Sequence, residues 1–158
     1  MTLERQLCET YDPAYNCGRL LALLDDLQYA SQGDVGADIV ARFYGNASTY
    51  PRNVFQRLLR LEKHHRAKLL KNREKKKIGF ALGRKIDDLC ALFPGAVPGG
   101  PPEFPGILNP HEQGRFALGF HQQKAKDDRD LREYLASKAD GATGADVVAD
   151  ASSDPDTD

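Results

Sequence analysis

The sequence has no long apolar segment. Its apolar runs fall well short of the roughly 20 residues that a membrane-spanning helix needs, and no signal-peptide pattern follows Met1. It also has no sustained alternation of apolar and polar residues, which is the pattern of a half-buried strand. These absences argue against a membrane protein, a secreted protein and a β-sheet domain. We therefore expect a cytoplasmic protein of the all-α class that makes no contact with membranes.

Cysteine is scarce as well. The chain has three, Cys8, Cys17 and Cys90, which are widely spaced and form no CxxC pair. An odd number of isolated cysteines in a reducing compartment predicts free thiols, and their spacing does not suit a structural zinc site. The sequence also lacks a glycine-rich phosphate loop and a dinucleotide-binding fingerprint. We expect neither a bound metal nor a cofactor.

Few groups could support catalysis. His64 and His65 are adjacent, so on a helix their side chains point about 100° apart, which is poor geometry for a shared metal. The acidic runs at 87–88 and 127–130 could suggest a nuclease metal site, but neither has a second carboxylate group at a useful spacing. Isolated acidic runs are usually solvated. We therefore expect a protein that is not an enzyme.

Apolar residues recur every three or four positions in several segments, which predicts amphipathic helices. We expect helices from Asp12-Pro13 to about 31–33, over 36–44, from Pro51 to about Asn72, from the 73–77 region to Phe93, and from Asn109-Pro110 to about Ser137. Residues 45–49, which read Gly-Asn-Ala-Ser-Thr, are expected to break the second of these helices.

Two segments are expected to be non-helical. Residues 94–105 contain five prolines, which cannot continue a helix. Residues 139–158 contain six aspartates, no basic residue and mostly small side chains, a composition typical of disorder. The sequence therefore predicts a compact helical bundle of about four or five helices over residues 1–138, followed by a disordered acidic tail over residues 139–158.

Acidic residues are nearly missing from one stretch. From Arg52 to Lys85 the chain has 13 Lys or Arg against two acids, Glu62 and Glu74, which gives a net charge of +11. The remaining residues carry 9 bases and 21 acids, a net charge of −12, so the total of −1 hides a strong asymmetry. Such a split indicates an anionic partner for one part of the surface.

Helical spacing arranges part of this stretch into a line. Five residues three or four positions apart form what we call the cationic ridge, about 20 Å long at ~1.5 Å per residue: Arg57, Arg60, His64, Lys68 and Lys71. His65 falls on the opposite, apolar side, where we expect a core residue. Cations at this spacing can neutralise successive phosphates of a nucleic acid and position it without reading its bases.

The other cations of the stretch are weaker candidates for phosphate contact. They are Arg52, Lys63, Arg66, Arg73, Lys75, Lys76, Lys77, Arg84 and Lys85. Phe80 lies among some of them and could stack on a base, although an exposed aromatic more often meets another protein surface. Gly79 and Gly83, one helical turn apart, are expected to allow close packing.

Three strings of the sequence match patterns of a known family. Residues 16–24 resemble N-x-G-R-L-x-A-x-L, residues 44–61 resemble Y-x-x-A-S-x-x-P-x-x-V-F-x-R-L-L-R-L, and residues 112–120 resemble E-Q-G-x-F-x-L-G-[YF]. They occur in the order of the family. Together they resemble the C-terminal region of the large subunit of the type I-C CRISPR Cascade surveillance complex. A free-standing version is similar to the separately translated small subunit of that complex.

The resemblance implies a function in antiviral defence. It implies a non-catalytic helical bundle, present in several copies beside the CRISPR RNA, the backbone subunits and the large subunit. There it would support the guide–target duplex and the displaced strand through DNA backbone contacts without sequence specificity. The matched pattern carries over Arg57 and Arg60. An alternative stays open, namely a structural spacer or helical adaptor whose basic face meets acidic protein surfaces and touches little nucleic acid.

Overall fold

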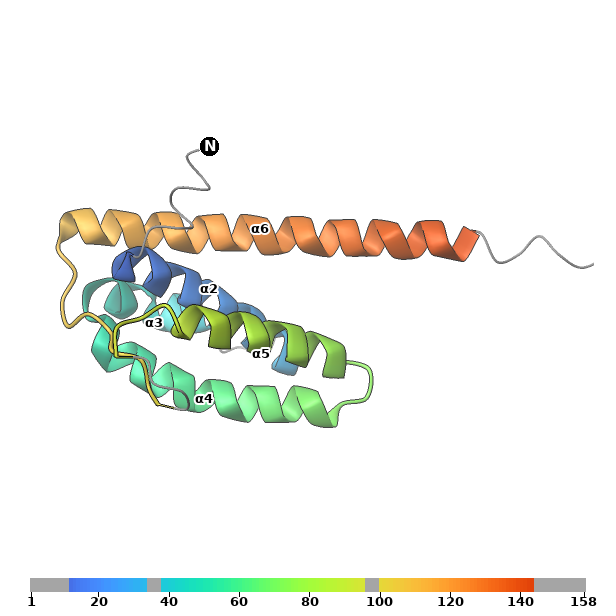
Figure 1. Ribbon diagram of the computed structural model, residues 1–158, viewed down its shortest axis with the longest axis horizontal. Coiled ribbons are helices and arrows are strands. Elements are labelled where there is room, and N and C mark those ends of the chain that lie inside the picture. Colours follow the sequence, from blue (N-terminus) through green and yellow to red (C-terminus); the bar gives the residue numbers. More distant parts are fainter. Residues whose placement is uncertain (1–11, 34–37, 96–99, 144–158) are drawn as a thin grey trace, which may run out of the picture. The chain divides into compact units, whose positions relative to one another are not determined.

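The computed structural model describes residues 12–33, 38–95 and 100–143, and the side chains as far as residue 137. The chain divides into two units, residues 1–125 and residues 126–158, which we describe separately. All regular elements in the described ranges are α-helices (Figure 1), and this confirms the all-α prediction. No helix in those ranges combines the length and the apolar character that crossing a membrane requires.

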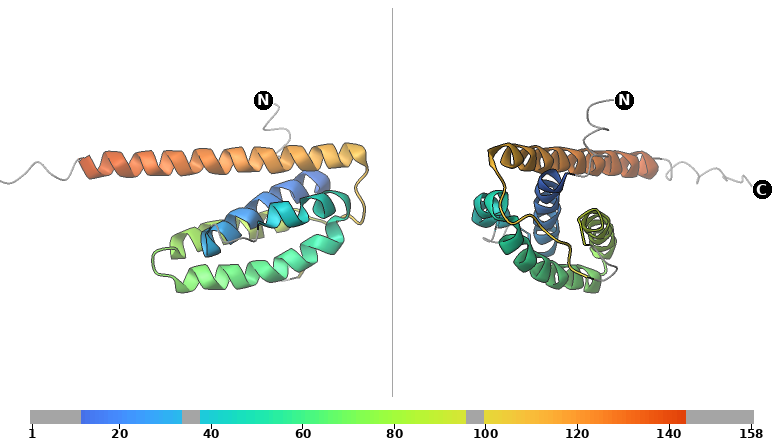
Figure 2. Two further views of the ribbon diagram at one scale, coloured as in Figure 1. Left: turned by 180° about the vertical axis from the view of Figure 1, so that it is seen from behind. Right: turned by 60° about the vertical axis from the view of Figure 1, so that its left-hand side comes forward.

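Helix α2 (Pro13–Gln32) is the central helix of the first unit. Asp12 caps it, because its Oδ1 accepts the backbone N–H groups of Ala14 and Tyr15 at 3.0 and 3.4 Å. Gly33, with φ of 69°, ends it. The expected start and end of this helix are therefore confirmed. It lies beside α3, α4 and α5 (Figure 2). Its leucines are each at most 2% exposed: Leu20, Leu21, Leu23, Leu24 and Leu27.

Helix α3 (Ile39–Thr49) is longer than expected. The break expected at residues 45–49 is wrong, because the helix continues through them. The hydroxyl groups of Ser48 and Thr49 both donate to the carbonyl oxygen of Gly45, each at 2.9 Å, and Ala47 is fully buried. Burial on this face offsets the ~1 kcal/mol that a glycine costs inside a helix. Only Tyr50 separates α3 from α4.

Helices α4 (Pro51–Lys71) and α5 (Lys76–Cys90) form an antiparallel hairpin (Figure 1). The turn between them is fixed by Asn72, whose Oδ1 accepts the N–H groups of residues 74 and 75. Gly79 and Gly83 let the helices approach closely, as expected. A Cβ at Gly79 would lie 2.8 Å from the Cβ of Leu69, and one at Gly83 would lie 2.9 Å from the Nε of Arg66.

The described part of the proline-rich segment, from residue 100 on, is non-helical up to α6, as expected. It closes one end of the core, since Phe104 is buried and its ring lies 5.2 Å from that of Phe55 and 5.0 Å from that of Phe93. The N–H of Arg52 donates to the carbonyl of Pro105 at 3.0 Å. This bond satisfies one of the N–H groups that the start of a helix leaves without a partner.

Helix α6 (Pro110–Thr143) begins at the expected position and with a capping box. The N–H of Asn109 donates to the Glu112 carboxylate at 2.7 Å, and the Glu112 N–H donates to the Asn109 side chain at 2.9 Å. Within the first unit α6 crosses α2 at two glycines. A Cβ at Gly18 would overlap the carbonyl oxygen of Phe116, and one at Gly119 would overlap that of Tyr15. The crossing therefore has no room for a larger residue.

The part of α6 in the second unit has little core of its own. The helix persists past Ser137, and its apolar residues Leu131, Tyr134 and Leu135 are all more than half exposed. It ends at Thr143, five residues into the segment from residue 139 that was expected to be disordered. The rest of that expected tail, residues 144–158, lies outside the described residues.

Candidate nucleic-acid interface

Helix α4 places the cationic ridge on its exposed side. All five ridge residues are exposed: Arg57, Arg60, His64, Lys68 and Lys71. The opposite side of the helix is buried through Val54, Phe55, Leu58, His65 and Leu69. The helix takes this orientation because its apolar face packs against α2, α3 and α5. The sequence-based division of α4 into a cationic side and a core side, with His65 in the core, is confirmed.

The charge of the ridge is not neutralised within the described part of the chain. Arg66, Arg115 and Lys124 form ion pairs there, whereas no residue of the ridge does. Glu62 points into the protein and is 5% exposed, while Glu74 lies in the turn after α4. An exposed line of cations without local counter-charges produces a positive potential that attracts a polyanion.

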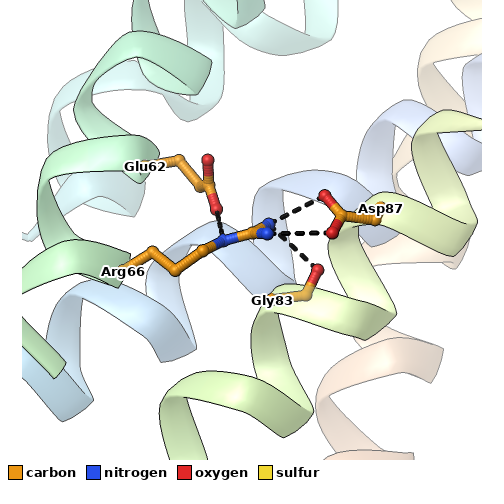
Figure 3. A network of polar contacts seen from close by, with 4 residues as sticks. All are labelled: Glu62, Arg66, Gly83 and Asp87. Carbon is orange, nitrogen blue, oxygen red and sulfur yellow. Dashed lines mark hydrogen bonds and ion pairs between the residues drawn. The ribbon is translucent and has the colours of Figure 1, made fainter. Parts of the chain in front are cut away.

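Arg66 has a structural role that the sequence did not reveal. Its guanidinium joins α4 to α5 (Figure 3), since Nε donates to Glu62 at 2.5 Å and both Nη atoms donate to Asp87 at 2.8 and 2.9 Å. Nη2 also donates to the carbonyl of Gly83 at 3.0 Å. Most of its donors are therefore occupied inside the protein, so Arg66 has few N–H groups left for contact with a phosphate.

The contacts of Arg66 with Glu62 and Asp87 also shift the pKa values of Glu62 and Arg66. Burial raises the pKa of Glu62, and the charge of Arg66 opposes this effect. Hydrogen bonds to Asp87 raise the pKa of Arg66, so the arginine stays charged. Asp87, one of the acids weighed for a nuclease site, is thus engaged by an arginine. Its neighbour Asp88 is exposed.

Among the weaker candidates, two cations also contact the protein backbone. Lys75 is partly buried and donates to the carbonyl of Ala30 at 3.0 Å, which ties the α4–α5 turn to α2. The Nε of Arg52 donates to the carbonyl of Phe104 at 3.1 Å, although the residue is exposed. One side-chain donor of each residue is therefore occupied within the protein.

The remaining candidates lie mostly on exposed surface. Exposed are Lys63 on α4, Arg73 in the turn, and Lys76, Lys77 and Arg84 on α5, whereas Lys85 is half-buried. Phe80 is 59% exposed, and the Nζ of Lys76 lies 5.9 Å from its ring centre. The sequence placed this aromatic away from the core among cations, and that placement is confirmed. The basic stretch thus forms two exposed surfaces, the ridge on α4 and the outer side of α5.

One basic residue near the ridge was not predicted from the sequence. Arg42 on α3 lies outside the stretch from Arg52 to Lys85, but it is exposed and close to the start of the ridge. The guanidinium carbons of Arg42 and Arg57 lie 5.7 and 5.5 Å from the ring centre of Phe43. The sequence contains no signal for this arrangement, because it depends on how α3 packs against α4.

Other reactive groups are held inside the first unit. Cys17 is buried and Cys90 is partly buried, and both are free thiols. Burial raises the pKa of Cys17 and raises that of Cys90 to about 12, so neither is a reactive thiolate at neutral pH. Cys8 lies outside the described residues. Across the described ranges, no three His, Cys, Asp or Glu side chains gather into a group that could hold a metal ion.

Comparison with known families gives one match that covers most of the chain. The model of a family described as CRISPR-associated protein (Cas_Csd1) matches residues 2–127. This range contains α2 to α5, the cationic ridge and the crossing of α2 with α6. Among curated proteins, no significant match was found.

Proposed function

The chain belongs to the CRISPR-associated Csd1 family, and from this premise we propose that it is a non-catalytic small subunit of an RNA-guided surveillance complex of the type I-C Cascade class. In this role it binds DNA backbone without sequence specificity and supports the guide–target duplex and the displaced strand. Its partners are the CRISPR RNA complex, the backbone and large subunits, and other copies of itself in the cytoplasm.

The exposed cationic ridge is the observation that carries the DNA-binding part of this proposal. Lysine and arginine at helical spacing neutralise phosphates and release counterions, which gives affinity for any sequence. Arg57 and Arg60 lie on the ridge and also within the string that resembles the family pattern. In RNA-guided recognition, base pairing reads the sequence while the protein holds backbones. A ridge without base-specific geometry suits that task.

Charge reversal on the ridge tests the proposal. We expect the full chain to bind a fluorescent single-stranded oligonucleotide, with affinity that falls as salt rises. Replacing Arg57→Glu and Arg60→Glu together should weaken binding at least about tenfold near 50 mM salt, and reduce the slope of log affinity against log salt by about 1.4, at ~0.7 for each phosphate contact on a single strand. Fluorescence anisotropy at several salt concentrations measures both quantities.

A matched control separates the ridge from total charge. Arg129→Glu with Arg132→Glu makes the same change in net charge at two positions of the second unit, and should leave affinity nearly unchanged. Circular dichroism checks that each variant is folded. Binding that does not respond to salt, or an equal loss in the control, would contradict DNA binding by the ridge. Either result would favour the alternative of a spacer or adaptor that meets acidic protein surfaces.

A further inference from the structure

Phe43 brings together two arginines from different helices. Its ring is partly buried and packs against the core, so its position is set by the fold rather than by the surface. Arg42 belongs to α3 and Arg57 to α4, and both guanidinium carbons lie within 5.7 Å of the ring centre. This distance is in the range of a cation–π contact. The two cations are thus held beside one rigid aromatic group.

The two guanidinium groups are close enough to share one ligand. Because both distances are measured to the same ring centre, the two carbons cannot lie farther apart than the sum of those distances, about 11 Å. One strand of B-DNA carries a phosphate every ~3.4 Å of helix axis. A span of about 11 Å covers more than one phosphate of a strand, so both arginines can contact the same strand.

Neither arginine is neutralised by an acid in the described ranges. No ion pair there involves Arg42 or Arg57, and both residues are exposed. The acid one helical turn before Arg42 is Asp38, whose carboxylate accepts the N–H of Val40 at 2.8 Å as a helix cap. A ring contact orients a guanidinium without neutralising it, unlike a salt bridge. The charges stay available, and less side-chain freedom is lost when they bind.

We propose that Arg42, Phe43 and Arg57 form an arginine clamp that binds phosphates of a single nucleic-acid strand. Arg42 is then a phosphate-binding residue beyond the cationic ridge, and Phe43 is a positioning residue that acts through the two arginines. The inference rests on the proposed DNA-binding function and deepens it, because it adds a defined phosphate site at the start of the ridge.

A mutant cycle on the full chain tests the clamp with a fluorescent oligothymidine strand. We expect Arg42→Gln and Arg57→Gln each to weaken binding about three- to tenfold and to lower the salt slope by about 0.7. Phe43→Leu keeps both charges and should weaken binding. In that background, Arg42→Gln should have less than about half of its effect on log affinity. Phe43→Tyr keeps an aromatic ring and should bind like the original chain.

The control is Arg129→Gln, which removes one positive charge from the second unit. Circular dichroism confirms that the Phe43 variants remain helical. If Arg57→Gln weakens binding while Arg42→Gln behaves like Arg129→Gln, the clamp is refuted and the DNA-binding function stands. An unchanged effect of Arg42→Gln in the Phe43→Leu background refutes the positioning role of the ring. If the original chain shows no salt-sensitive binding, both proposals fail together.

Discussion

Gly18 is one of the two glycines at which α2 and α6 approach each other closely. A side chain there would overlap the carbonyl oxygen of Phe116, which is backbone and cannot move aside alone. We therefore predict that Gly18→Ala lowers the free energy of unfolding by about 1–3 kcal/mol, the usual cost of overpacking. Urea unfolding measures this change.

Gly114 provides the matched control for Gly18, because it is also helical but a Cβ added there would meet no neighbouring atom within 4 Å. Gly114→Ala should be neutral or should stabilise the protein by up to about 1 kcal/mol, the helix-propensity difference between the two residues. Equal effects at both positions would contradict the close crossing.

His65 makes the stability of the first unit depend on pH. Its Nδ1 lies 2.8 Å from the hydroxyl oxygen of Ser31, which itself donates to the carbonyl of Gln28. Burial, with the nearby charges of His64 and Lys68, lowers the pKa of His65 below its ordinary value of 6.5. The unfolded chain therefore binds a proton more readily than the folded protein does.

We predict that this contribution to stability is complete above pH 6.5 and is lost as the pH falls from 6.5 through the lowered pKa of the folded state. Urea unfolding between pH 7.5 and about pH 5 measures it, and His65→Gln should flatten this part of the curve. His64→Gln is the control, because His64 is exposed and its loss should leave most of the pH dependence. If His65→Gln keeps the original pH dependence of the free energy of unfolding, the pH dependence does not come from His65.

At the scale of elements, the α4–α5 hairpin depends on Arg66. Removing this side chain leaves Glu62, which is 5% exposed, without its ion-pair partner. We predict that Arg66→Met lowers the free energy of unfolding by about 3 kcal/mol, in line with the loss of one partner of a buried pair. Asp87 is the comparison, since its side chain is 64% exposed and Asp87→Asn should cost less than about 1 kcal/mol. Urea unfolding measures both variants. Similar losses would contradict the claim that the buried Glu62 pair contributes more to stability than the exposed Asp87 pair.

The helix starts were predictable because their signals are local. Asp12 and Asn109 each precede a proline, as the sequence indicates. The side chain of Asp12 accepts two backbone N–H groups of the first turn, and that of Asn109 accepts one. The end of α3 was not predictable. The residues from Gly45 to Thr49 favour a turn by composition, but the burial of Ala47 against other helices keeps them helical.

The ridge was predictable for a similar reason, because helical phase alone separates its five residues from the buried side of α4. Arg66 was not, since its partners Gly83 and Asp87 belong to α5. The contact of Arg42 with Phe43 and Arg57 also depends on packing between helices. Contacts that cross between elements set these roles, and the sequence pattern does not contain them.

At the scale of the whole molecule, the strings that resemble the family meet in space within the first unit. The first and third strings meet where α2 crosses α6, through Gly18 and Gly119, and a hydrogen bond of 3.0 Å joins Arg19 of the first string to Gln123, just after the third. The second string supplies Tyr44, whose ring lies 5.4 Å from that of Phe116. These contacts explain why the strings mark the fold. They do not bear on DNA binding, for which the cationic ridge is separate evidence.

The most direct test of the account is a structure of the assembled surveillance complex with target DNA, which shows what lies against the cationic ridge. We predict phosphate oxygens within hydrogen-bond distance of Arg57, Arg60 and at least one of Lys68 and Lys71, on the displaced strand or the guide–target duplex. An acidic protein surface covering the ridge, with no phosphate within reach of these side chains, would contradict the account.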